Sequence, residues 1–230
     1  MTARPVALVT GASRGIGAAV AEALAPTHRL LLGGRDEPAL TRLAETLPSA
    51  APLPMDLADL AGLPSVVAGI DRLDVLVHSA GTVTIASLPR TPVEVWRRTL
   101  DLNVIAVAEL TRLLLPALHA ATGQVVLINS GQGLRASVDW GAYAASKFAL
   151  RAYADVLRAE EAASGLRVTT VFPGRTATDM QREVRAAEGG EFVAENYLRP
   201  ESVADAVRFA IEAPPDAQLT ELTLRPATRP

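Results

Sequence analysis

Residues 6–17 read VALVTGASRGIG, and this stretch decides the fold. Its first five residues are apolar or β-branched, which predicts a buried strand over residues 6–10. A helical pattern over residues 15–25 follows at once. Gly11 lies between them, and Gly15 and Gly17 lie in the first turn of the helix. Glycines permit a tight turn, and the free N–H groups at the start of the helix favour a pyrophosphate. The segment therefore predicts a strand–turn–helix unit that binds a dinucleotide.

The rest of the chain alternates short β-rich segments with longer helical patterns. Strands are expected at residues 6–10, 30–33, 51–54, 75–79, 124–129, 167–172 and 219–224. Helices are expected at residues 15–25, 38–47, 91–120, 142–164 and 201–213. Most of the strands are apolar on both faces, as strands are when helices cover both sides of a parallel sheet. With right-handed crossovers, this pattern predicts a doubly wound, Rossmann-like α/β fold of about seven strands in one domain, residues 1–230.

The composition limits the classes of protein to consider. The chain has 230 residues, 49% of them hydrophobic, and a formal net charge of −3, so it lacks the basic excess that favours nucleic acid. The longest uncharged stretch, residues 113–134, is interrupted by polar residues and Pro116, and no secretory leader pattern opens the sequence. We therefore expect a cytoplasmic protein that binds neither nucleic acid nor membrane. With no cysteine and three scattered histidines, no metal site is expected.

Tyr143 and Lys147 are the first candidates for catalysis. Lys147 is the only lysine among 22 basic residues, and lysine differs from arginine in its compact charge and its movable pKa. The two residues lie four apart on a predicted helix, where the ammonium is expected to lower the tyrosine pKa. Such a pair also arises by chance on exposed helices. Ser130, at the carboxyl end of a predicted strand, either donates a hydrogen bond to a substrate carbonyl or is a turn serine.

The end of the second predicted strand bears on the choice of cofactor. Sites for the non-phosphorylated dinucleotide place an acid there, about 20 residues after the glycine turn, whereas this chain has Gly33-Gly34-Arg35. Arg35 and Arg14 could bracket a 2′-phosphate, which predicts that NADP(H) is preferred over NAD(H). Two other interpretations remain open. Asp36 could pair with Arg35, or both arginines could be solvated surface charges.

Together these residues resemble the short-chain dehydrogenase/reductase family, in its short single-domain branch, over essentially the whole chain. The motifs that carry the resemblance are the Thr10–Gly17 turn, Asp56, Ala80-Gly81, Asn103, Ser130, Tyr143, Lys147, and Pro173-Gly174 with Thr178. They follow one another in the family's order. The resemblance implies an NAD(P)-dependent oxidoreductase that interconverts a carbonyl and a secondary alcohol on a small-molecule substrate.

By the same resemblance, four residues form the catalytic set. Tyr143 would act as general acid and base, and Lys147 would also hold the nicotinamide ribose. Ser130 would orient the substrate carbonyl, and Asn103 would fix a water molecule in a proton relay. The alternative is a protein that binds NAD(P) as a sensor or scaffold without turnover. The completeness of the catalytic set argues against it.

The resemblance extends to the cofactor. Asp56 would accept the adenine amino group, and Pro173-Gly174 with Thr178 would seat the nicotinamide. The full set expected to bind the cofactor is Gly11, Ser13, Arg14, Gly15, Ile16, Gly17, Arg35, Asp56, Leu57, Ala80, Gly81, Tyr143, Lys147, Pro173, Gly174, Thr176 and Thr178.

Two motifs depart from the family pattern. His78-Ser79 stands where the family commonly has two asparagines before Ala80-Gly81, and Asn129-Ser130 stands where it has two serines. His78 is expected to be a buried, hydrogen-bonded structural residue, with a catalytic base as the sharper alternative.

Residues 175–199 interrupt the alternation of strands and helices. This charged segment contains Gly189-Gly190 and is either a lid over the substrate or a mobile surface insertion. Specificity is expected to depend on residues 134–140 and on this segment. The side chains expected at the substrate are Arg135, Trp140, Met180, Phe192 and Tyr197.

A homodimer or homotetramer is expected from the second half of the helix at 91–120. Its leucines surround the helix and exceed what one sheet-facing stripe hides. They are Leu110, Leu113, Leu114, Leu115 and Leu118.

Overall fold

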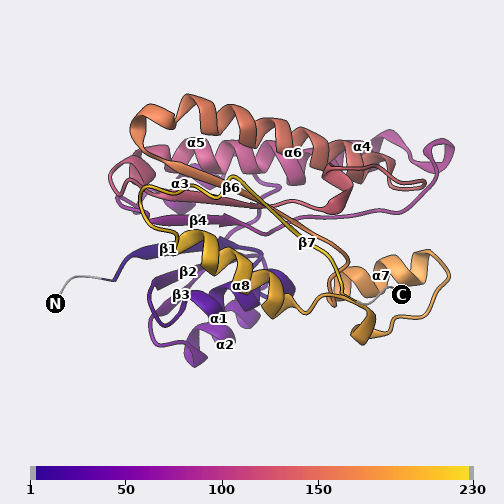
Figure 1. Ribbon diagram of the computed structural model, residues 1–230, viewed down its shortest axis with the longest axis horizontal. Helices are drawn as coiled ribbons and strands as arrows, with labels where there is room; N and C mark the ends of the chain where they lie inside the picture. Colours follow the sequence, from indigo (N-terminus) through magenta and orange to yellow (C-terminus); the bar gives the residue numbers. More distant parts are fainter. Residues whose placement is uncertain (1–3, 228–230) are drawn as a thin grey trace.

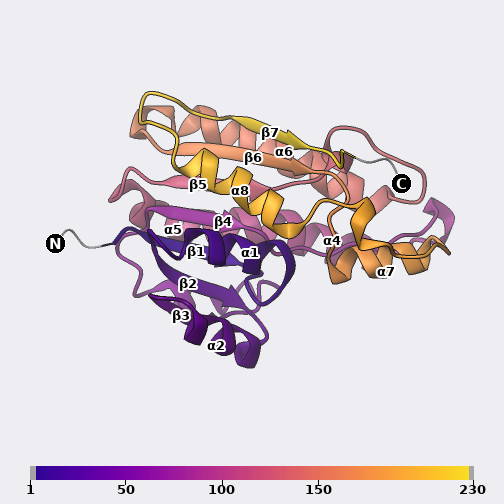
Figure 2. The same cartoon turned by 60° about the horizontal axis from the view of Figure 1, so that its bottom comes forward.

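The computed structural model describes residues 4–227 as one α/β unit (Figures 1 and 2). Seven parallel strands form one sheet in the order β3-β2-β1-β4-β5-β6-β7. The strands are β1 Val6–Thr10, β2 Arg29–Gly34, β3 Ala50–Pro54, β4 Val75–His78, β5 Gln124–Ile128, β6 Arg167–Pro173 and β7 Glu221–Leu224. The order reverses between β1 and β4, and such a switch point opens a crevice at the carboxyl ends of the strands. The expected fold class is confirmed.

Helices cover both faces of the sheet. They are α1 Gly15–Leu24, α2 Glu37–Thr46, α3 Leu63–Val67, α4 Val93–Leu100, α5 Ala106–His119, α6 Gly141–Glu160, α7 Asp179–Ala187 and α8 Pro200–Ile211. Single helical turns lie at Leu88–Arg90, Asp101–Ile105, Gly131–Gly133, Ala162–Ser164 and Ala194–Asn196. Figure 1 shows α4, α5 and α6 on one side of the sheet and α1, α2 and α8 on the other. Helix α7 lies apart from both layers, beyond the carboxyl ends of the strands.

Alternate residues of β1 enter two separate hydrophobic cores. Leu8 packs in the core that contains α5 and α6, whereas Ala7 and Val9 pack in the core that contains α1 and α8. All three side chains are fully buried. Because side chains alternate along a strand, apolar residues at every position bury both faces of the sheet.

The helix expected at 91–120 is present as one continuous helix over residues 93–119, although a π turn interrupts its regular period. It consists of α4, a π-helical turn at Asp101–Ile105, and α5. A π turn inserts one residue into the helical repeat and often marks a functional site. Together, residues 93–119 are long and apolar enough to cross a membrane by length and composition alone, a test that core helices also pass.

The leucines of α5 do not require a partner molecule. Leu110, Leu114 and Leu118 are buried at 0–1% exposure, and Leu113 and Leu115 pack partly against the same core. The argument for an oligomer from these five residues therefore does not hold. Exposed apolar side chains lie elsewhere, at Ile105, Phe148, Val156 and Phe209 among others.

Helices α3 and α7 have no counterpart in the expected elements. Helix α3 has only five residues, too few to show a helical period. Helix α7 reads DMQREVRAA and buries only Gln181 and Val184, so its apolar stripe is too narrow to stand out. Part of the segment 175–199 is therefore an ordered helix.

Two of the three outward positions on the β3 edge of the sheet lack a hydrogen-bond donor. Met55 donates its N–H to the Gly34 carbonyl on β2 at 2.9 Å. Because N–H groups alternate along a strand, residues 51 and 53 face β2 as Met55 does, whereas Pro52 and Pro54 occupy outward positions. Proline has no N–H, so these outward positions of β3 offer no donor.

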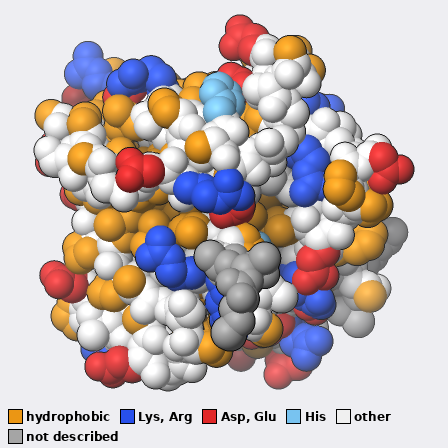
Figure 3. Space-filling model, turned by 90° about the vertical axis from the view of Figure 1, so that its left-hand side faces the viewer, with side chains coloured by type: hydrophobic (Ala, Val, Ile, Leu, Met, Phe, Trp, Pro, Cys, Tyr) orange, Lys and Arg blue, Asp and Glu red, His pale blue; other side chains and the backbone are white. Residues whose placement is uncertain are grey.

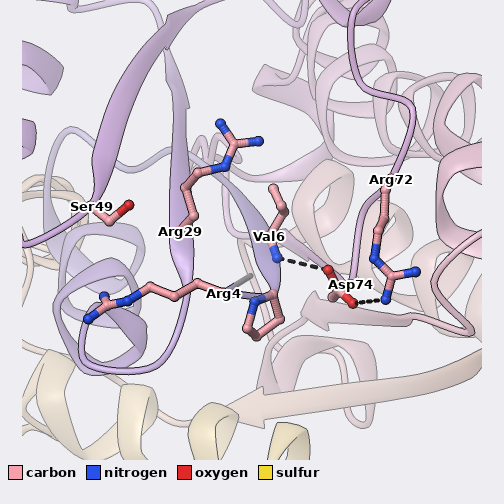
Figure 4. A pocket seen from close by; sticks show the side chains of 7 residues that line it. Arg4, Val6, Arg29, Ser49, Arg72 and Asp74 are labelled. Carbon is pink, nitrogen blue, oxygen red and sulfur yellow. Dashed lines mark hydrogen bonds and ion pairs between the residues drawn. The ribbon is translucent and has the colours of Figure 1, made fainter. Parts of the chain in front are cut away.

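A cavity of about 590 Å³ lies at the amino ends of the strands, on the face shown in Figure 3. Asp74 joins two strands there, as Figure 4 shows. It accepts hydrogen bonds from the Val6 N–H at 2.8 Å and from Arg72 at 2.7 Å. Arg4 and Arg29 also line this cavity. It lies at the opposite end of the strands from the glycine turn.

Candidate active site

The glycine turn packs directly against the turn after β4. Gly11 has φ +68°, and a Cβ on it would lie 2.9 Å from the main chain of Ala80. The Thr10 hydroxyl accepts hydrogen bonds from the Ser79 and Ala80 N–H groups, at 3.1 and 3.3 Å. Thr10 therefore fastens the two turns to each other. Sequence reasoning left it out of the site, although its place before the first glycine was a usable signal.

The start of α1 fits a bound phosphate. Gly15 has φ +60°, and a Cβ on Gly17 would overlap the Gly11 carbonyl oxygen. Arg14 occupies the N-cap, and no described side chain caps the helix there. The first N–H groups of a helix have no intrahelical partner, so they are donors for an anion. The backbone thus forms a cradle of the kind that a dinucleotide pyrophosphate requires.

The side chains near the end of β2 show whether Asp36 pairs with Arg35. Asp36 accepts a hydrogen bond from the Ala39 N–H at 3.0 Å and caps α2, and it forms no ion pair with Arg35. Arg35 is exposed and has no side-chain hydrogen bond within residues 4–227. Arg14 donates to Asp179 at 3.2 Å, and both of these side chains are at least 60% exposed. Exposed ion pairs are weak, so this one would yield readily to a competing anion.

Asp56 and Leu57 follow β3 at the same edge of the sheet. Asp56 is exposed and accepts a hydrogen bond from the Ala58 N–H at 3.0 Å, through one of its two oxygens. Leu57 is 7% exposed and packs in the core. The position suits contact with an adenine, because the other carboxylate oxygen forms no hydrogen bond within residues 4–227.

Ser130 and Tyr143 meet at the end of β5. The Ser130 N–H donates to the Asn129 side chain at 2.8 Å, and the Asn129 amide donates to the Lys147 carbonyl at 3.0 Å. Asn129, which replaces a serine of the family pattern, therefore ties the serine turn to α6. The Ser130 side chain lies close enough to the Tyr143 phenol to act on its pKa, which it lowers.

Lys147 lies beneath Tyr143 in the interior. Its ammonium donates to the Ile128 carbonyl at 3.0 Å and lies 5.7 Å from the centre of the Tyr143 ring. Burial lowers the pKa of Lys147 from 10.5 to about 8. Burial raises the pKa of Tyr143, and the nearby Ser130 side chain acts in the opposite direction. The expected lowering of the tyrosine pKa is therefore not found here, because desolvation outweighs the other effects.

Asn103 lies in the π turn and joins three segments. Its side-chain oxygen accepts from the Thr82 N–H at 2.9 Å, and its amide donates to the Thr82 carbonyl and the Ser146 hydroxyl, both at 3.0 Å. Both amide hydrogens are thus in use. The side chain is 1% exposed and is a structural link between the β4 turn and α6.

His78 is a buried structural residue, as expected. The Thr111 hydroxyl donates to the Val107 carbonyl at 2.8 Å, so His78 must donate from Nε2 to Thr111, at 2.9 Å. Nδ1 then carries no proton, and it has no partner among the described residues. Burial lowers the pKa of His78 to about 3, which keeps it neutral.

A cavity of about 360 Å³ lies at the carboxyl ends of β5 and β6. Expected site residues that line it are Ile16, Ser130, Tyr143, Pro173, Gly174, Thr176 and Thr178. Of the side chains expected at the substrate, Arg135, Trp140 and Met180 line it. Phe192 and Tyr197 do not, because their rings stack on each other at 5.3 Å within the segment 175–199.

Comparison with known proteins places the chain in a family. The profile of the family described as short chain dehydrogenase matches residues 5–189. Glycine betaine reductase ATRR of Emericella nidulans is 35% identical over 98% of this chain, which spans 19% of that protein. The uncharacterized short-chain type dehydrogenase/reductase y4eK of Sinorhizobium fredii is 34% identical, with 96% of this chain and 91% of that protein covered.

Solved structures agree with the sequence matches. The alcohol dehydrogenase from the archaeon Thermococcus sibiricus, complexed with 5-hydroxy-NADP, superimposes with a TM-score of 0.89 at 27% identity. The superposition covers 99% of each chain. On the family match, the relatives and this shared structure, the chain belongs to the short-chain dehydrogenase/reductase family and is an NAD(P)-dependent oxidoreductase.

Proposed function

We propose that this protein interconverts a carbonyl and a secondary alcohol, with NADP(H) as the preferred cofactor and Tyr143 as the general acid and base. One observation carries the proposal. Ser130 and Tyr143 line the same cavity at the carboxyl ends of β5 and β6. Two neighbouring O–H groups there can hold one substrate oxygen.

The roles of the side chains follow from their positions. A nicotinamide held beside Pro173, Gly174 and Thr178 would supply the hydride for reduction and accept it in oxidation. Tyr143 gives its proton to the carbonyl oxygen in reduction and removes the alcohol proton in oxidation. Ser130 donates a hydrogen bond to the same oxygen as negative charge develops on it. The Lys147 ammonium, beneath the ring, favours the tyrosinate that remains after proton donation.

Asn103 acts differently from the role expected of it. Because both of its amide hydrogens are bonded, we assign it to positioning the β4 turn against α6. The π turn around it shifts the main-chain hydrogen bonds, with the Ala106 N–H donating to the Asp101 carbonyl five residues back.

The cofactor preference rests on the end of β2. Arg35 is exposed and unpaired within residues 4–227, and Gly34 supplies no carboxylate to repel a phosphate. A solved relative binds an NADP derivative. We further propose that the protein acts in the cytoplasm on a small-molecule substrate, as a homodimer or homotetramer.

Turnover of carbonyl compounds tests the proposed function. Oxidation of NADPH is followed at 340 nm as a set of aldehydes and ketones is added, with the wild type and with Tyr143→Phe. The variant is expected to lose at least about a thousandfold in kcat, since it removes the acid and base. Tyr153→Phe on the same helix is the matched control and should retain most of the activity. Equal activity of wild type and Tyr143→Phe would contradict the proposal. NADPH binding without any turnover would favour a sensor or scaffold.

A further inference from the structure

The cavity beside Ser130 is rich in positive charge. Arg135, Arg175 and Arg225 line it, and none of the described residues that line it is an aspartate or a glutamate. Arg175 donates two hydrogen bonds to the Glu188 carboxylate, at 2.8 and 2.6 Å, which neutralise its charge. Two arginine charges therefore remain at the cavity, with no carboxylate paired to them within residues 4–227.

Arg225 is held in place and still has a free donor. It follows β7, and its Nη1 donates to the carbonyls of Phe172 and Leu224, at 3.0 and 2.8 Å. Neutral carbonyls fix the side chain without cancelling its charge. Its Nη2 has no hydrogen bond within residues 4–227 and lies 3.3 Å from where a Cβ on Gly131 would stand. Gly131 is the residue after Ser130, so this donor lies beside the proposed carbonyl site.

Gln181 on α7 also lines the cavity and is 7% exposed, and its side-chain amide nitrogen is buried with no hydrogen-bond partner within residues 4–227. A buried amide N–H without a partner costs about 1–3 kcal/mol. This nitrogen has almost no accessible surface, so a ligand reaches it only if the side chain turns toward the cavity. The donor open to a ligand is therefore Arg225 Nη2, and a lining without an acidic side chain favours a ligand that presents acceptor oxygens.

The size and the remaining walls of the cavity restrict the ligand further. Met180, Val184 and Trp140 supply apolar surface. The volume is about 360 Å³, and a nicotinamide ring must share it, so little room remains for a long substrate.

We propose that the substrate is a small carbonyl compound that carries a carboxylate, and that Arg225 binds this carboxylate through Nη2. Arg135, exposed at the mouth of the cavity, adds attraction at longer range. The inference rests on the proposed oxidoreductase function and adds the substrate class to it.

Matched pairs of substrates test the inference. The substrates are 2-oxobutanoate, acetoacetate and levulinate, each compared with its methyl ester under NADPH. In the wild type at least one acid is expected to exceed its ester in kcat/KM by about tenfold or more, as a charge-assisted hydrogen bond allows. In Arg225→Met this ratio is expected to fall to within about threefold of one. Arg208→Met on α8, outside the cavity, should keep the wild-type ratio and serves as the matched control.

Two outcomes overturn the inference while the oxidoreductase function stands. One is reduction of ketones by the wild type with no preference for any acid over its ester. The other is an equal loss on acid and ester in Arg225→Met together with weaker NADPH binding, which would assign Arg225 to the cofactor.

Direct binding separates this inference from the proposed function. Calorimetry measures oxamate and oxamide binding to protein saturated with NADP⁺. Oxamate is expected to bind at least about tenfold more tightly than oxamide, and Arg225→Met should remove the difference. Selective binding of oxamate without turnover of any carbonyl would contradict the oxidoreductase function and still support the carboxylate site. Equal binding of the two probes would overturn the site.

Discussion

At the scale of single residues, the buried ammonium of Lys147 contacts both the main chain of β5 and the Tyr143 ring. Arginine keeps the charge but is wider and planar, and the space beneath the ring holds a compact group. Lys147→Arg is therefore expected to lower kcat by about a hundredfold or more. Measurement of kcat, with cofactor binding as the check on folding, tests this. Near-normal turnover would show that a point charge is not required.

Lys147 also makes stability depend on pH. Its pKa is about 8 in the folded protein against 10.5 as its ordinary value. Between these values the unfolded chain binds more protons, so the free energy of unfolding rises as the pH rises through this window. The gain is bounded at about 3 kcal/mol. Lys147→Met should lack this rise, which urea unfolding of both proteins at pH 7.5 and pH 10 would measure. An equal change in the free energy of unfolding of both proteins between the two pH values would contradict the role of Lys147.

Arg35 is the residue on which the cofactor preference depends. Arg35→Asp removes a donor for the 2′-phosphate and places a carboxylate near the ribose hydroxyls, so NADPH should lose its advantage over NADH. The wild type is expected to bind NADPH at least about tenfold more tightly than NADH, or about 1.4 kcal/mol. Fluorescence titration measures both affinities. Arg29→Asp, at the other end of β2, is the control, and equal affinities in the wild type would refute the preference.

At the scale of elements, Glu188 holds the segment 175–199 together. It accepts hydrogen bonds from Arg175, next to β6, and from Arg185 on α7. These arginines keep the pKa of Glu188 below its usual range, with Arg175 as the main cause. The segment should therefore loosen only when the pH falls below the ordinary pKa of a glutamate carboxyl. The segment contains helix α7, and the ion pair of Arg175 with Glu188 ties its start to the end of that helix. This ordered structure favours a lid over a mobile insertion.

Glu188→Gln should free this segment without unfolding the core. We expect tryptic cleavage within α7 to become several times faster while the melting temperature changes by only a few degrees, because the ion pairs lie near the surface. Timed proteolysis with mass spectrometry measures the cleavage. Glu183→Gln on the same helix has no ion pair within residues 4–227 to lose and is the control. Equal cleavage of the two variants would refute the role of Glu188.

The elements also show how far sequence reasoning reaches. All seven strands were predictable, because four to seven mostly apolar residues between turns leave few other structures. The π turn was not, since apolar residues flank it on both sides and only the main-chain bond from the Ala106 N–H to the Asp101 carbonyl, five residues back, reveals the extra residue. The raised pKa of Tyr143 was not predicted for a similar reason. Spacing places Lys147 near Tyr143, but it does not report how deeply both are buried.

At the scale of the whole molecule, we propose that copies meet through exposed apolar residues on α6 and the π turn. Phe148 and Val156 on α6 are 43% and 54% exposed, and Ile105 on the adjacent π turn is 45% exposed. Light scattering at micromolar concentration should detect a dimer or tetramer in the wild type. The double variant Phe148→Asp, Val156→Asp should be smaller, because buried carboxylates oppose association. Phe209→Asp on α8 is the comparison. A wild-type monomer, or dissociation only by Phe209→Asp, would contradict this interface.

The two prolines of β3 limit how such molecules can aggregate. A sheet that grows from copy to copy needs two edges that each accept a new strand. Pro52 and Pro54 remove two of the three outward donors from the β3 edge, which leaves the β7 edge, four residues without proline, as the better acceptor of a strand. Joining through β7 would use up that edge in both copies and leave two β3 edges outside. Edge addition is therefore expected to favour a pair of molecules over a growing fibre.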